Sequence, residues 1–600
     1  MSGPGRRLWR IFRREGAAAA LRRVRTRAGL LVRREPAPHR RDYLAWIAEN
    51  EPDLPGLAAQ REVVGAMAHR PFFTVFVCGS PSGPRDREAA LAGLEAQTYP
   101  DWELYTPPAP GEPGRGRGRT PGFPRGDWWV LLSRGARLAP DALFEAARRV
   151  GAGEVDAVYA DNDVLDRKGR RNDPFLKPDF SPELLLSVDY LAPFLAVRSS
   201  WLEDKALPET EAEHWALSCR LAESRRAIAH VPKILSHAAR ACDAAAGRRA
   251  VEASLRRQGV PATVEITPDR RLHAVWPAPD VEVGVVIPTR DGEPRLRPCL
   301  ASLARTRGRL SIVVVDNGSA DPATLRFLDE ERRAGRVTVL RRPGPFNWSA
   351  LNNAGVGALR TPVLAFLNDD IEATDGGWLE ELVRWALRPE IGVAGGLLRR
   401  ADGSVQHAGV AFGIGGLAAH PFEGAREDGT GLLGPVGWYR NWLAVTGACQ
   451  VMRREVWEKL GGFDEEFGAL FSDVDFCVRA WRLGLRNVCT PYARLVHHHG
   501  TTRGGDRLMP PHDFLVALDR FGPLLAQGDP FFNPNVSRWS ALPTLRRLGD
   551  ADAGRWLEVL AELLRERYPG EAARRPQLVA ALGREVDTRL RAADARRRGR

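Results

Sequence analysis

Short apolar runs, each ended by polar residues, recur along the chain and predict the strands of an α/β protein. In the second half these runs occupy residues 283–288, 311–315 and 363–367, and a helical spacing of apolar residues covers 296–306. Runs of Val, Ile, Leu and Phe are typical of strands buried on both faces. Ligands of open α/β sheets bind just past the carboxyl ends of such strands, so the polar residues there are candidates for a site.

The first half repeats this pattern with fewer elements. It predicts strands at 73–77, 102–105 and 128–132 and a helix at 87–97. About twenty-five residues separate its second and third strands, against about fifty in the second half, and they are rich in Pro, Gly and Arg. A loop of that composition cannot supply the missing strand and helix.

The residues that follow the third strand also differ between the halves. The second half has Asn368-Asp369-Asp370 there, whereas the first half has Ser133-Arg134-Gly135-Ala136. An arginine at this place would repel a divalent cation. We therefore interpret the first half as a degenerate copy that has lost nucleotide and metal binding.

Length and cysteine usage set the bounds for the fold. Six hundred residues exceed one hydrophobic core and predict about two to four domains. No run approaches the roughly 18–20 apolar residues of a membrane span, and the start lacks the apolar core of a signal peptide. Seven scattered cysteines without CxxC spacing indicate reduced thiols, a cytoplasmic setting and no zinc site.

The net charge of +12 is concentrated at the start of the chain. Residues 1–41 hold thirteen arginines against two glutamates, and the rest is close to balanced. This distribution argues against a nucleic-acid-binding body, whose charge would lie on a folded face with stacking aromatics. The leader mixes these arginines with Leu, Val, Trp and Phe, which suits a helix on an anionic membrane surface and suits equally a solvated arm.

Acidic and histidine motifs mark the second half between residues 285 and 500. Asp316 and Asp370 follow predicted strands, and Asp473 and a run of three histidines at 497–499 come later. Carboxylates are hard ligands suited to Mg²⁺ or Mn²⁺, and such an ion can bridge diphosphate oxygens. Together these motifs are what a metal-dependent nucleotide-sugar site needs.

The second half carries an ordered series of short motifs at its predicted strand ends and in the loops. They are Val286-Ile287-Pro288-Thr289-Arg290, Val315-Asp316-Asn317-Gly318-Ser319, Pro343-Gly344-Pro345-Phe346-Asn347-Trp348-Ser349, Leu367-Asn368-Asp369-Asp370, Gln406-His407-Ala408-Gly409, Thr446-Gly447-Ala448-Cys449, Gly461-Gly462-Phe463-Asp464, Asp473-Val474-Asp475 and His497-His498-His499. Through the number and order of these motifs, residues 281–535 specifically resemble a family 2 glycosyltransferase with the GT-A fold, most closely the bacterial O-antigen and rhamnan biosynthesis enzymes, including rhamnosyltransferases.

The first half resembles the extra amino-terminal GT-A-like domain of tandem members, through Tyr159-Ala160-Asp161-Asn162-Asp163 and Asp173-Pro174-Phe175-Leu176-Lys177. The expected fold is therefore α/β, with two GT-A (Rossmann-like) domains in tandem, the first of them degenerate. We expect a basic leader at 1–70, the degenerate domain at 71–275, the catalytic domain at 281–535 and a helical basic extension at 536–600.

The resemblance implies a nucleotide-sugar site at the strand ends of the second half. Asp316 is assigned to the nucleotide, with a turn or helix-cap aspartate as the alternative. The other expected nucleotide-sugar residues are Pro288, Thr289, Arg290, Asp291, Asn347, Asn352, Asn353 and Asp369. For the asparagines, capping of the following helix is an equal alternative.

The implied metal is Mn²⁺ or Mg²⁺, which offsets charge on the departing nucleotide. Asp370 is the expected metal ligand, and its neighbour Asp369 points to the opposite face if both lie on a strand. His497 completes the metal shell, with His499 as the rival in the histidine run. A turn motif for the aspartates and a buried structural histidine pair are the alternatives.

Asp473 is the expected general base, which takes the proton of the acceptor hydroxyl as the sugar centre inverts. The start of a helix at Ser472-Asp473 is the alternative and is compatible with catalysis. Acceptor contacts are expected from Asp464, Asp475, Trp442 and His407. Core packing is the alternative for the tryptophan.

The sequence therefore predicts an inverting, metal-dependent glycosyltransferase that acts on a bacterial surface glycan or a lipid-linked acceptor. The resemblance favours dTDP-rhamnose as donor, with UDP-sugars next. The expected location is cytoplasmic, including the inner face of the membrane as a peripheral protein. A non-catalytic scaffold or a glycan-binding subunit of a polysaccharide assembly complex is the alternative, and nucleic acid is not an expected partner.

Overall fold

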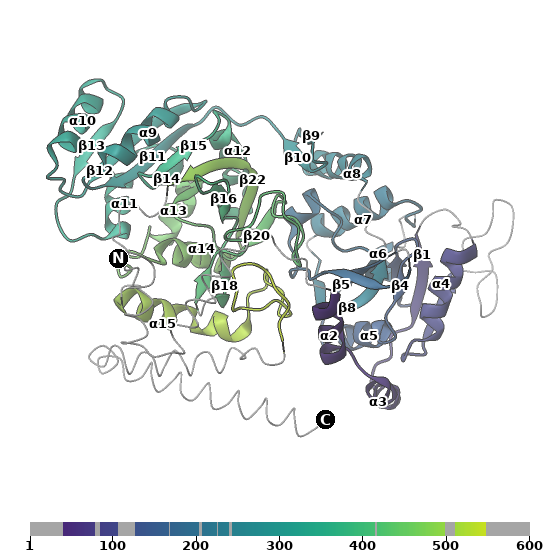
Figure 1. Ribbon diagram of the computed structural model, residues 1–600. Helices are drawn as coiled ribbons and strands as arrows, with labels where there is room; N and C mark the ends of the chain where they lie inside the picture. The colour runs from purple at the N-terminus through teal and green to yellow at the C-terminus, as the bar shows by residue number, and fades with distance from the viewer. Residues whose placement is uncertain are drawn as a thin grey trace.

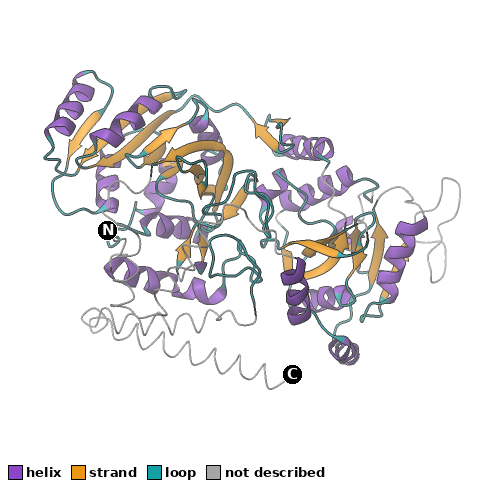
Figure 2. Ribbon diagram, viewed as in Figure 1, coloured by secondary structure: helices purple, strands orange, loops and turns teal. Residues whose placement is uncertain are grey.

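The computed structural model describes residues 40–78, 84–105, 126–166, 168–202, 207–224, 226–238, 243–414, 417–498 and 511–547. Two α/β halves lie side by side, each with a twisted sheet and helices packed on it (Figure 1, Figure 2). Most of the expected leader at 1–70 and most of the expected helical extension at 536–600 lie outside the described residues. Among the helices that are described, none has the length and apolar character needed to cross a membrane.

The first half has one main sheet with the strand order β2-β1-β3-β7-β5-β8-β4, and β6 pairs with β5. Its strands are β1 Phe73–Val77, β2 Trp102–Tyr105, β3 Trp128–Leu132, β4 Arg137–Leu138, β5 Ala157–Leu165, β6 Arg171–Phe175, β7 Phe194–Arg198 and β8 Ile228–Ala238. Its helices are α2 Arg40–Asn50, α3 Leu54–Gly65, α4 Pro84–Glu95, α5 Ala142–Gly151, η1 Pro182–Leu186, α6 Ser199–Leu202, α7 Glu211–Glu223 and α8 Ala244–Arg257. The hairpin of β9 Thr263–Ile266 and β10 Leu272–Val275 leads into the second half.

The second half has the strand order β13-β12-β11-β14-β21-β16-β22-β15, with β17 on β16 and β20 on β22. Its strands are β11 Glu282–Thr289, β12 Arg309–Asp316, β13 Thr338–Arg341, β14 Val363–Leu367, β15 Ile371–Ala373, β16 Ile391–Arg399, β17 Val405–His407, β18 Ala411–Phe412, β19 Ala418–Ala419, β20 Arg440–Trp442, β21 Cys449–Arg453 and β22 Arg486–His497. Its helices are α9 Glu293–Leu303, α10 Pro322–Arg333, α11 Trp348–Gly357, α12 Trp378–Ala386, α13 Arg454–Leu460, α14 Ser472–Arg482 and α15 Pro511–Gln527.

The two sheets have the same topology, strand for strand. The order β2-β1-β3-β7-β5-β8-β4 matches β12-β11-β14-β21-β16-β22-β15, and the side pairing of β6 on β5 matches that of β17 on β16. Parallel strands at one end and a mixed sheet at the other recur in both halves. The chain is therefore a tandem of two GT-A-like α/β units, as the sequence predicted.

The halves differ where the sequence indicated a deletion. In the second half β13 and the helices α10 and α11 lie between β12 and β14, and β13 forms the outer edge of the sheet. Among the described residues of the first half, no strand pairs with the outer side of β2. The loop that replaces these elements, residues 106–125, is outside the described residues.

Polar contacts join the two halves into a common interface. Arg486 on β22 donates to the buried Glu183 of η1, with the shortest distance 2.7 Å between Nη2 and Oε1. Ser181 donates its hydroxyl to Asn441 Oδ1 at 2.7 Å, and Asn533 donates to Asp161 Oδ2 at 2.8 Å. Because such buried groups need their partners, these contacts fix the first half onto the second half.

The first half holds a closed polar network at the place that corresponds to His497. His237 pairs with β4 as His497 pairs with β15, so the two histidines are topological equivalents. His237 Nδ1 lies 2.6 Å from Asp163 Oδ1. Asp163 Oδ2 accepts from Tyr43 of α2 and from Arg171, and Asp163 is fully buried. Helix α2 thus covers this carboxylate, which stands as a structural centre of the first half.

Replacing Asp163 with asparagine is expected to lower stability. The variant loses the negative charge and one of the two carboxylate oxygens, of which Oδ1 faces His237 and Oδ2 accepts from Tyr43 and Arg171. Leaving partners of such a buried network unsatisfied costs about 1–3 kcal/mol. The measurement is the thermal unfolding midpoint of the full chain, with the exposed Asp127→Asn as a matched control. Equal midpoints for the two variants would contradict the structural role of Asp163.

Candidate active site

The carboxyl ends of β11, β12 and β14 bring the predicted nucleotide residues together. These strands are parallel neighbours, and their register places Thr289 directly beside Asp316. Pro288 lies one position earlier, buried within β11 opposite Val315. Since parallel strands end at one edge of the sheet, this edge is where the family expectation places the nucleotide.

Asp316 is almost fully buried, and its carboxylate accepts hydrogen bonds from a backbone amide and from an arginine. Its Oδ1 accepts from the Ser319 amide at 2.8 Å, and its Oδ2 accepts from Arg341 Nη1 at 2.8 Å. Arg341 comes from β13, the strand that has no described counterpart in the first half. Arg341 was not identified from the sequence, because only the β12–β13 pairing shows its proximity to Asp316.

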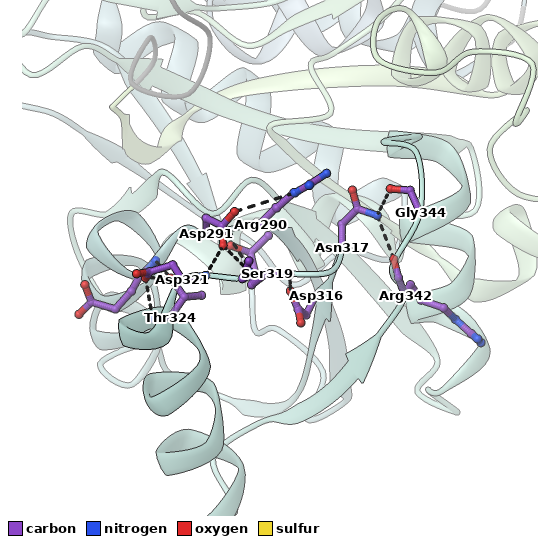
Figure 3. Close-up of polar contacts among 12 residues, drawn as sticks. Arg290, Asp291, Asp316, Asn317, Ser319, Asp321, Thr324, Arg342 and Gly344 are labelled. Carbon is purple, nitrogen blue, oxygen red and sulfur yellow. Dashed lines mark hydrogen bonds and ion pairs between the residues drawn. The ribbon is translucent and has the colours of Figure 1, made fainter.

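Asp291 organises the loop after β12 rather than standing free for a base. Its Oδ1 accepts from the amides of Ala320 and Asp321 at 2.7 and 2.8 Å, and its own amide donates to Ser319 Oγ (Figure 3). These backbone hydrogen bonds lower the pKa of Asp291. The preceding Arg290 is exposed, so it is the better placed of the two to meet a ligand.

Asn317 continues this loop toward the segment after β13. Its amide donates to the carbonyls of Arg342 and Gly344, at 2.9 and 3.4 Å (Figure 3). Its Oδ1 is buried and has no hydrogen-bond partner within the described part of the chain. These contacts hold the Pro-Gly-Pro-Phe turn of residues 343–346 against the loop that follows β12.

The two adjacent aspartates after β14 serve different neighbours. Asp369 accepts from Thr289 Oγ1 at 2.7 Å and from Arg295 of α9 at 3.2 Å. Burial raises the pKa of Asp369. Gly292 leaves room for this contact, because a Cβ there would lie 2.5 Å from Asp369 Oδ2. Asp369 therefore ties the ends of β11 and β14 together.

Asp370 faces the histidine at the end of β22. Asp370 Oδ1 lies 3.1 Å from His497 Nε2, and both side chains are buried. His497 Nδ1 lies 3.2 Å from Gln406 Oε1 on β17. The next histidine, His498, turns instead to Glu372 at 3.0 Å. His499, the rival in the sequence, is outside the described residues.

Asp473 begins helix α14 and is held by the loop before β21. Its Oδ2 accepts from the Gly447 amide at 2.6 Å. A Cβ on Gly447 would lie 2.9 Å from both Asp473 Cβ and the Trp348 ring, so only glycine fits between them. Burial raises the pKa of Asp473, which brings its proton affinity closer to what a general base at neutral pH needs.

The three predicted asparagines bind protein rather than pointing into open space. Asn347 caps α11 by accepting from the Ala350 amide at 2.8 Å and donates to the Glu465 carbonyl. Asn353 exchanges hydrogen bonds with the backbone of Phe463. Asn352 is fully buried and donates to Trp348. Capping, the second interpretation from the sequence, is thus present at Asn347, and the sugar contact expected of Asn352 is blocked by burial.

Three of the predicted acceptor residues also contact other residues of the protein. Arg520 of α15 donates to Asp464 at 2.7 Å and to Asp475 at 3.3 Å, and Asp475 accepts further from Arg479. Trp442 is 1% exposed and packs against Gly409, where a Cβ would lie 2.1 Å from its ring. Trp442 therefore packs in the core, the alternative that the sequence left open. The two aspartates tie α15 to the loop before α14 and to α14 itself.

A family model described as "Glycosyl transferase family 2" matches residues 284–461. This segment holds Thr289, Asp316, Asp370 and Gly447, while Asp473 and His497 follow it. The chain is 35% identical over 559 residues to the O-antigen biosynthesis protein RfbC of Myxococcus xanthus, which covers 85% of this chain and 44% of that protein. The chain thus spans less than half the length of this relative.

A second relative matches a smaller share of the chain. The N-acetylglucosaminyl-diphospho-decaprenol L-rhamnosyltransferase of Mycobacterium tuberculosis is 28% identical over 248 residues, which is 37% of this chain and 78% of that protein. Among solved structures, GalNAc-T7 with UDP, GalNAc and Mn²⁺ is similar with a TM-score of 0.35 and 18% identity over 42% of this chain and 50% of that chain. By the family model, residues 284–461 of the present chain are a family 2 glycosyltransferase domain, and they lie on the second of the two sheets.

Proposed function

We propose that the second half is an inverting, metal-dependent glycosyltransferase and that the first half is non-catalytic. The observation that carries this proposal is the placement of the Asp370–His497 pair and of Asp473 around the sheet that holds the family 2 segment 284–461. We place the catalytic domain at 281–535 and the non-catalytic domain at 71–275. The buried network around Asp163 supports the second assignment, because it fills the equivalent place with protein.

The residues present fit a divalent cation. If His497 Nδ1 donates to Gln406 Oε1, a neutral imidazole turns the Nε2 lone pair toward Asp370 Oδ1, 3.1 Å away. Two electron-rich atoms at this distance need a proton or a cation between them. Oxygen and imidazole nitrogen suit Mn²⁺, and Mg²⁺ prefers the oxygen. Among the described side chains, no group of three or more His, Cys, Asp or Glu residues is arranged to hold a metal ion by itself.

Asp370 and His497 are the residues that would hold the ion. A bound divalent ion would supply charge neutralisation at the diphosphate leaving group. Asp473 takes the proton of the acceptor hydroxyl while that oxygen forms a bond to the anomeric carbon. The bond from this carbon to the diphosphate oxygen breaks, and the nucleoside diphosphate leaves. Attack from the face opposite the leaving group inverts the sugar centre.

We favour rhamnose as the transferred sugar, from dTDP-rhamnose, with UDP-sugars next. The support is the rhamnosyltransferase name of the mycobacterial relative and the O-antigen name of the myxobacterial one. By the same support, the acceptor is a growing bacterial surface glycan or a lipid-linked sugar. The competing function for the whole chain is that of a non-catalytic scaffold or a glycan-binding subunit of a polysaccharide assembly complex, and a first half without catalysis fits such a role.

A panel of nucleotide sugars tests the function directly. The purified full chain is incubated with dTDP-rhamnose, UDP-glucose, UDP-N-acetylglucosamine and GDP-mannose in the presence of Mn²⁺. The expected result is release of nucleoside diphosphate from one donor, faster when a diphospho-prenol-linked sugar is added. Absence of binding and of hydrolysis for every donor would overturn the enzyme assignment.

We propose that the basic leader binds the protein peripherally to the inner face of the membrane. Deleting residues 1–35 is expected to move the protein from the membrane fraction to the soluble fraction, because eleven arginines are lost. High salt should mimic part of this loss, since charge attraction is screened over about 10 Å at 0.1 M. Unchanged sedimentation with vesicles that contain anionic lipid would contradict the membrane role.

A further inference from the structure

The loop of residues 461–471 (the base loop) joins α13 to α14 and leads directly to the proposed base. Asp473 lies in the first turn of α14. Phe471, the residue before this helix, has a left-handed backbone with a φ of 68°, and its side chain has no atom that could cap the helix. This conformation is unusual for a bulky residue, so the surroundings must hold it. The placement of Asp473 therefore depends on what holds the base loop.

A single buried carboxylate on α15 binds the end of this loop. Asp513 is 1% exposed, and it accepts hydrogen bonds from three successive backbone amides. Its Oδ1 accepts from Gly468 at 2.9 Å, and its Oδ2 accepts from Ala469 and Leu470 at 2.8 Å each. Hydrogen bonds to an ionised acceptor are stronger than those between neutral groups. Three of them on one carboxylate fix both the position and the orientation of this segment.

Helix α11 binds the same segment through its carbonyl groups. The Trp348 amide donates to the Gly468 carbonyl at 2.6 Å, and Ser349 Oγ donates to the Phe467 carbonyl at 2.9 Å. Ser349 Oγ also lies 2.7 Å from Oγ of Ser472, the first residue of α14. Gly468 is thus bonded to α15 through its amide and to α11 through its carbonyl.

A second residue of α15 contacts the base loop nearer its start. Arg520 Nη2 donates to Asp464 at 2.7 Å and to Glu466 at 3.1 Å, and its Nη1 donates to Asp475 of α14 at 3.3 Å. Arg520 is partly exposed, and solvent weakens ion pairs of this kind. The buried Asp513 is therefore the residue of α15 whose contacts with the loop have the larger effect.

The carboxylate of Asp473 is held separately, by the loop before β21. The Gly447 amide donates to Asp473 Oδ2 at 2.6 Å, and the neighbouring Thr446 amide donates to His407 Nε2 at 3.4 Å. His407, the fourth expected acceptor residue, is fully buried at the end of β17, and its Nδ1 lies 2.9 Å from His420 Nδ1. The base thus has two supports, one for its carboxylate and one, the base loop, for its backbone.

Resting on the proposed transferase function, we propose that Asp513 is a positioning residue for sugar transfer. It fixes the base loop, and the base loop keeps the Asp473 carboxylate at the place from which it takes the proton of the acceptor hydroxyl. A misplacement of about 1 Å can cost about 10²-fold in rate, so the effect of Asp513 falls on turnover. Its three hydrogen bonds go to the base loop rather than to the ends of β11, β12 and β14, so donor binding should persist.

A double-mutant cycle tests whether Asp513 acts through the base. The full chain is assayed with the nucleotide sugar and the diphospho-prenol-linked monosaccharide that the wild type uses. Asp513→Ala is expected to lower kcat by about 10–10²-fold. The donor KM and Mn²⁺-dependent donor binding should change by less than about twofold. In the Asp473→Asn chain the same Asp513→Ala change should alter kcat by less than about twofold, because the carboxylate that Asp513 positions is already gone.

Two further variants complete the test. Asp513→Asn keeps one acceptor oxygen and should recover part of kcat, and it takes the place of Asp513→Ala in the cycle if the alanine variant does not fold. The exposed Asp519→Ala, on the same helix, is the control and should leave kcat unchanged. A wild-type kcat in folded Asp513→Ala, or an equal fall of kcat with and without the Asp473 carboxylate, would overturn this inference alone. A wild-type chain that neither binds nor hydrolyses any nucleotide sugar would overturn the proposed function instead.

Discussion

Asp473→Asn is expected to lower sugar transfer by roughly 10²–10⁴, the usual scale for removing a general base. Asparagine keeps the size of the side chain. Its Oδ1 can still accept the hydrogen bond that the Gly447 amide donates to Asp473 Oδ2, with 2.6 Å between nitrogen and oxygen. It cannot take a proton from the acceptor hydroxyl. Nucleotide-sugar binding should persist, because Asp473 is not among the proposed donor ligands. The measurements are kcat/KM with acceptor and calorimetric donor binding.

The same substitution should leave the protein at least as stable as the wild type near neutral pH. Burial raises the pKa of Asp473 in the folded state, so its ionised form is destabilising there. This loss of stability is absent at a pH below the pKa that Asp473 has in the unfolded chain. It is complete once the pH has risen through the raised pKa of Asp473 in the folded state. Asparagine removes it. A stability gain together with an activity loss is typical of a residue kept for function.

The pH profile gives a further check on Asp473. Its active form is the carboxylate, so kcat/KM should fall on the acid side as pH drops through the raised pKa. Asp519→Asn, on the exposed face of α15, is the matched control. If Asp473→Asn transfers sugar at the wild-type rate, another group is the base.

Three strands in each half were predictable from the sequence, because buried strands consist of short apolar runs. The predicted strands 73–77, 102–105, 128–132 and 363–367 coincide with β1, β2, β3 and β14. The helices shifted by a few residues, for example α9 at Glu293–Leu303 against 296–306, because capping sets a helix end and periodicity does not. The duplicated order of strands was visible as a duplicated order of apolar runs.

The partners of the site residues were not predictable, because they come from distant parts of the chain. Arg341 reaches Asp316 only because β13 pairs with β12, and Arg295 reaches Asp369 across a separation of 74 residues. Likewise, the pairing of His407 with His420 depends on how β17 and the loop after β19 fold together. Motifs locate chemical groups at strand ends, whereas tertiary packing decides which of them remain available to a ligand.

The asparagines illustrate this limit most directly. Their types and spacing suit contacts with sugar or phosphate and suit equally a helix cap. In the structure Asn347 and Asn353 hold the loop of residues 463–466 against α11. They therefore act on the site through the loop that leads into Asp473. A sequence motif shared across a family can thus mark the support of a site as well as the site itself.

Asp370→Ala is expected to abolish most of the divalent-cation dependence of donor binding. The side chain is buried, and its Oδ1 lies 3.1 Å from His497 Nε2. An ion at a leaving diphosphate is worth several kcal/mol, so transfer should fall by about 10²-fold or more. EDTA should reduce wild-type transfer to a similar level, and Mn²⁺ or Mg²⁺ should restore it.

Three histidine variants assign the second ligand. His497→Gln should reduce the Mn²⁺ affinity measured by calorimetry on the donor-bound chain, because the imidazole nitrogen that faces Asp370 is lost. His498→Gln is the neighbouring control, since His498 turns to Glu372. His499→Gln tests the rival position in the histidine run. Full transfer in EDTA would remove the metal from the mechanism, and the Asp370–His497 contact would then be an ion pair that holds β15 against β22.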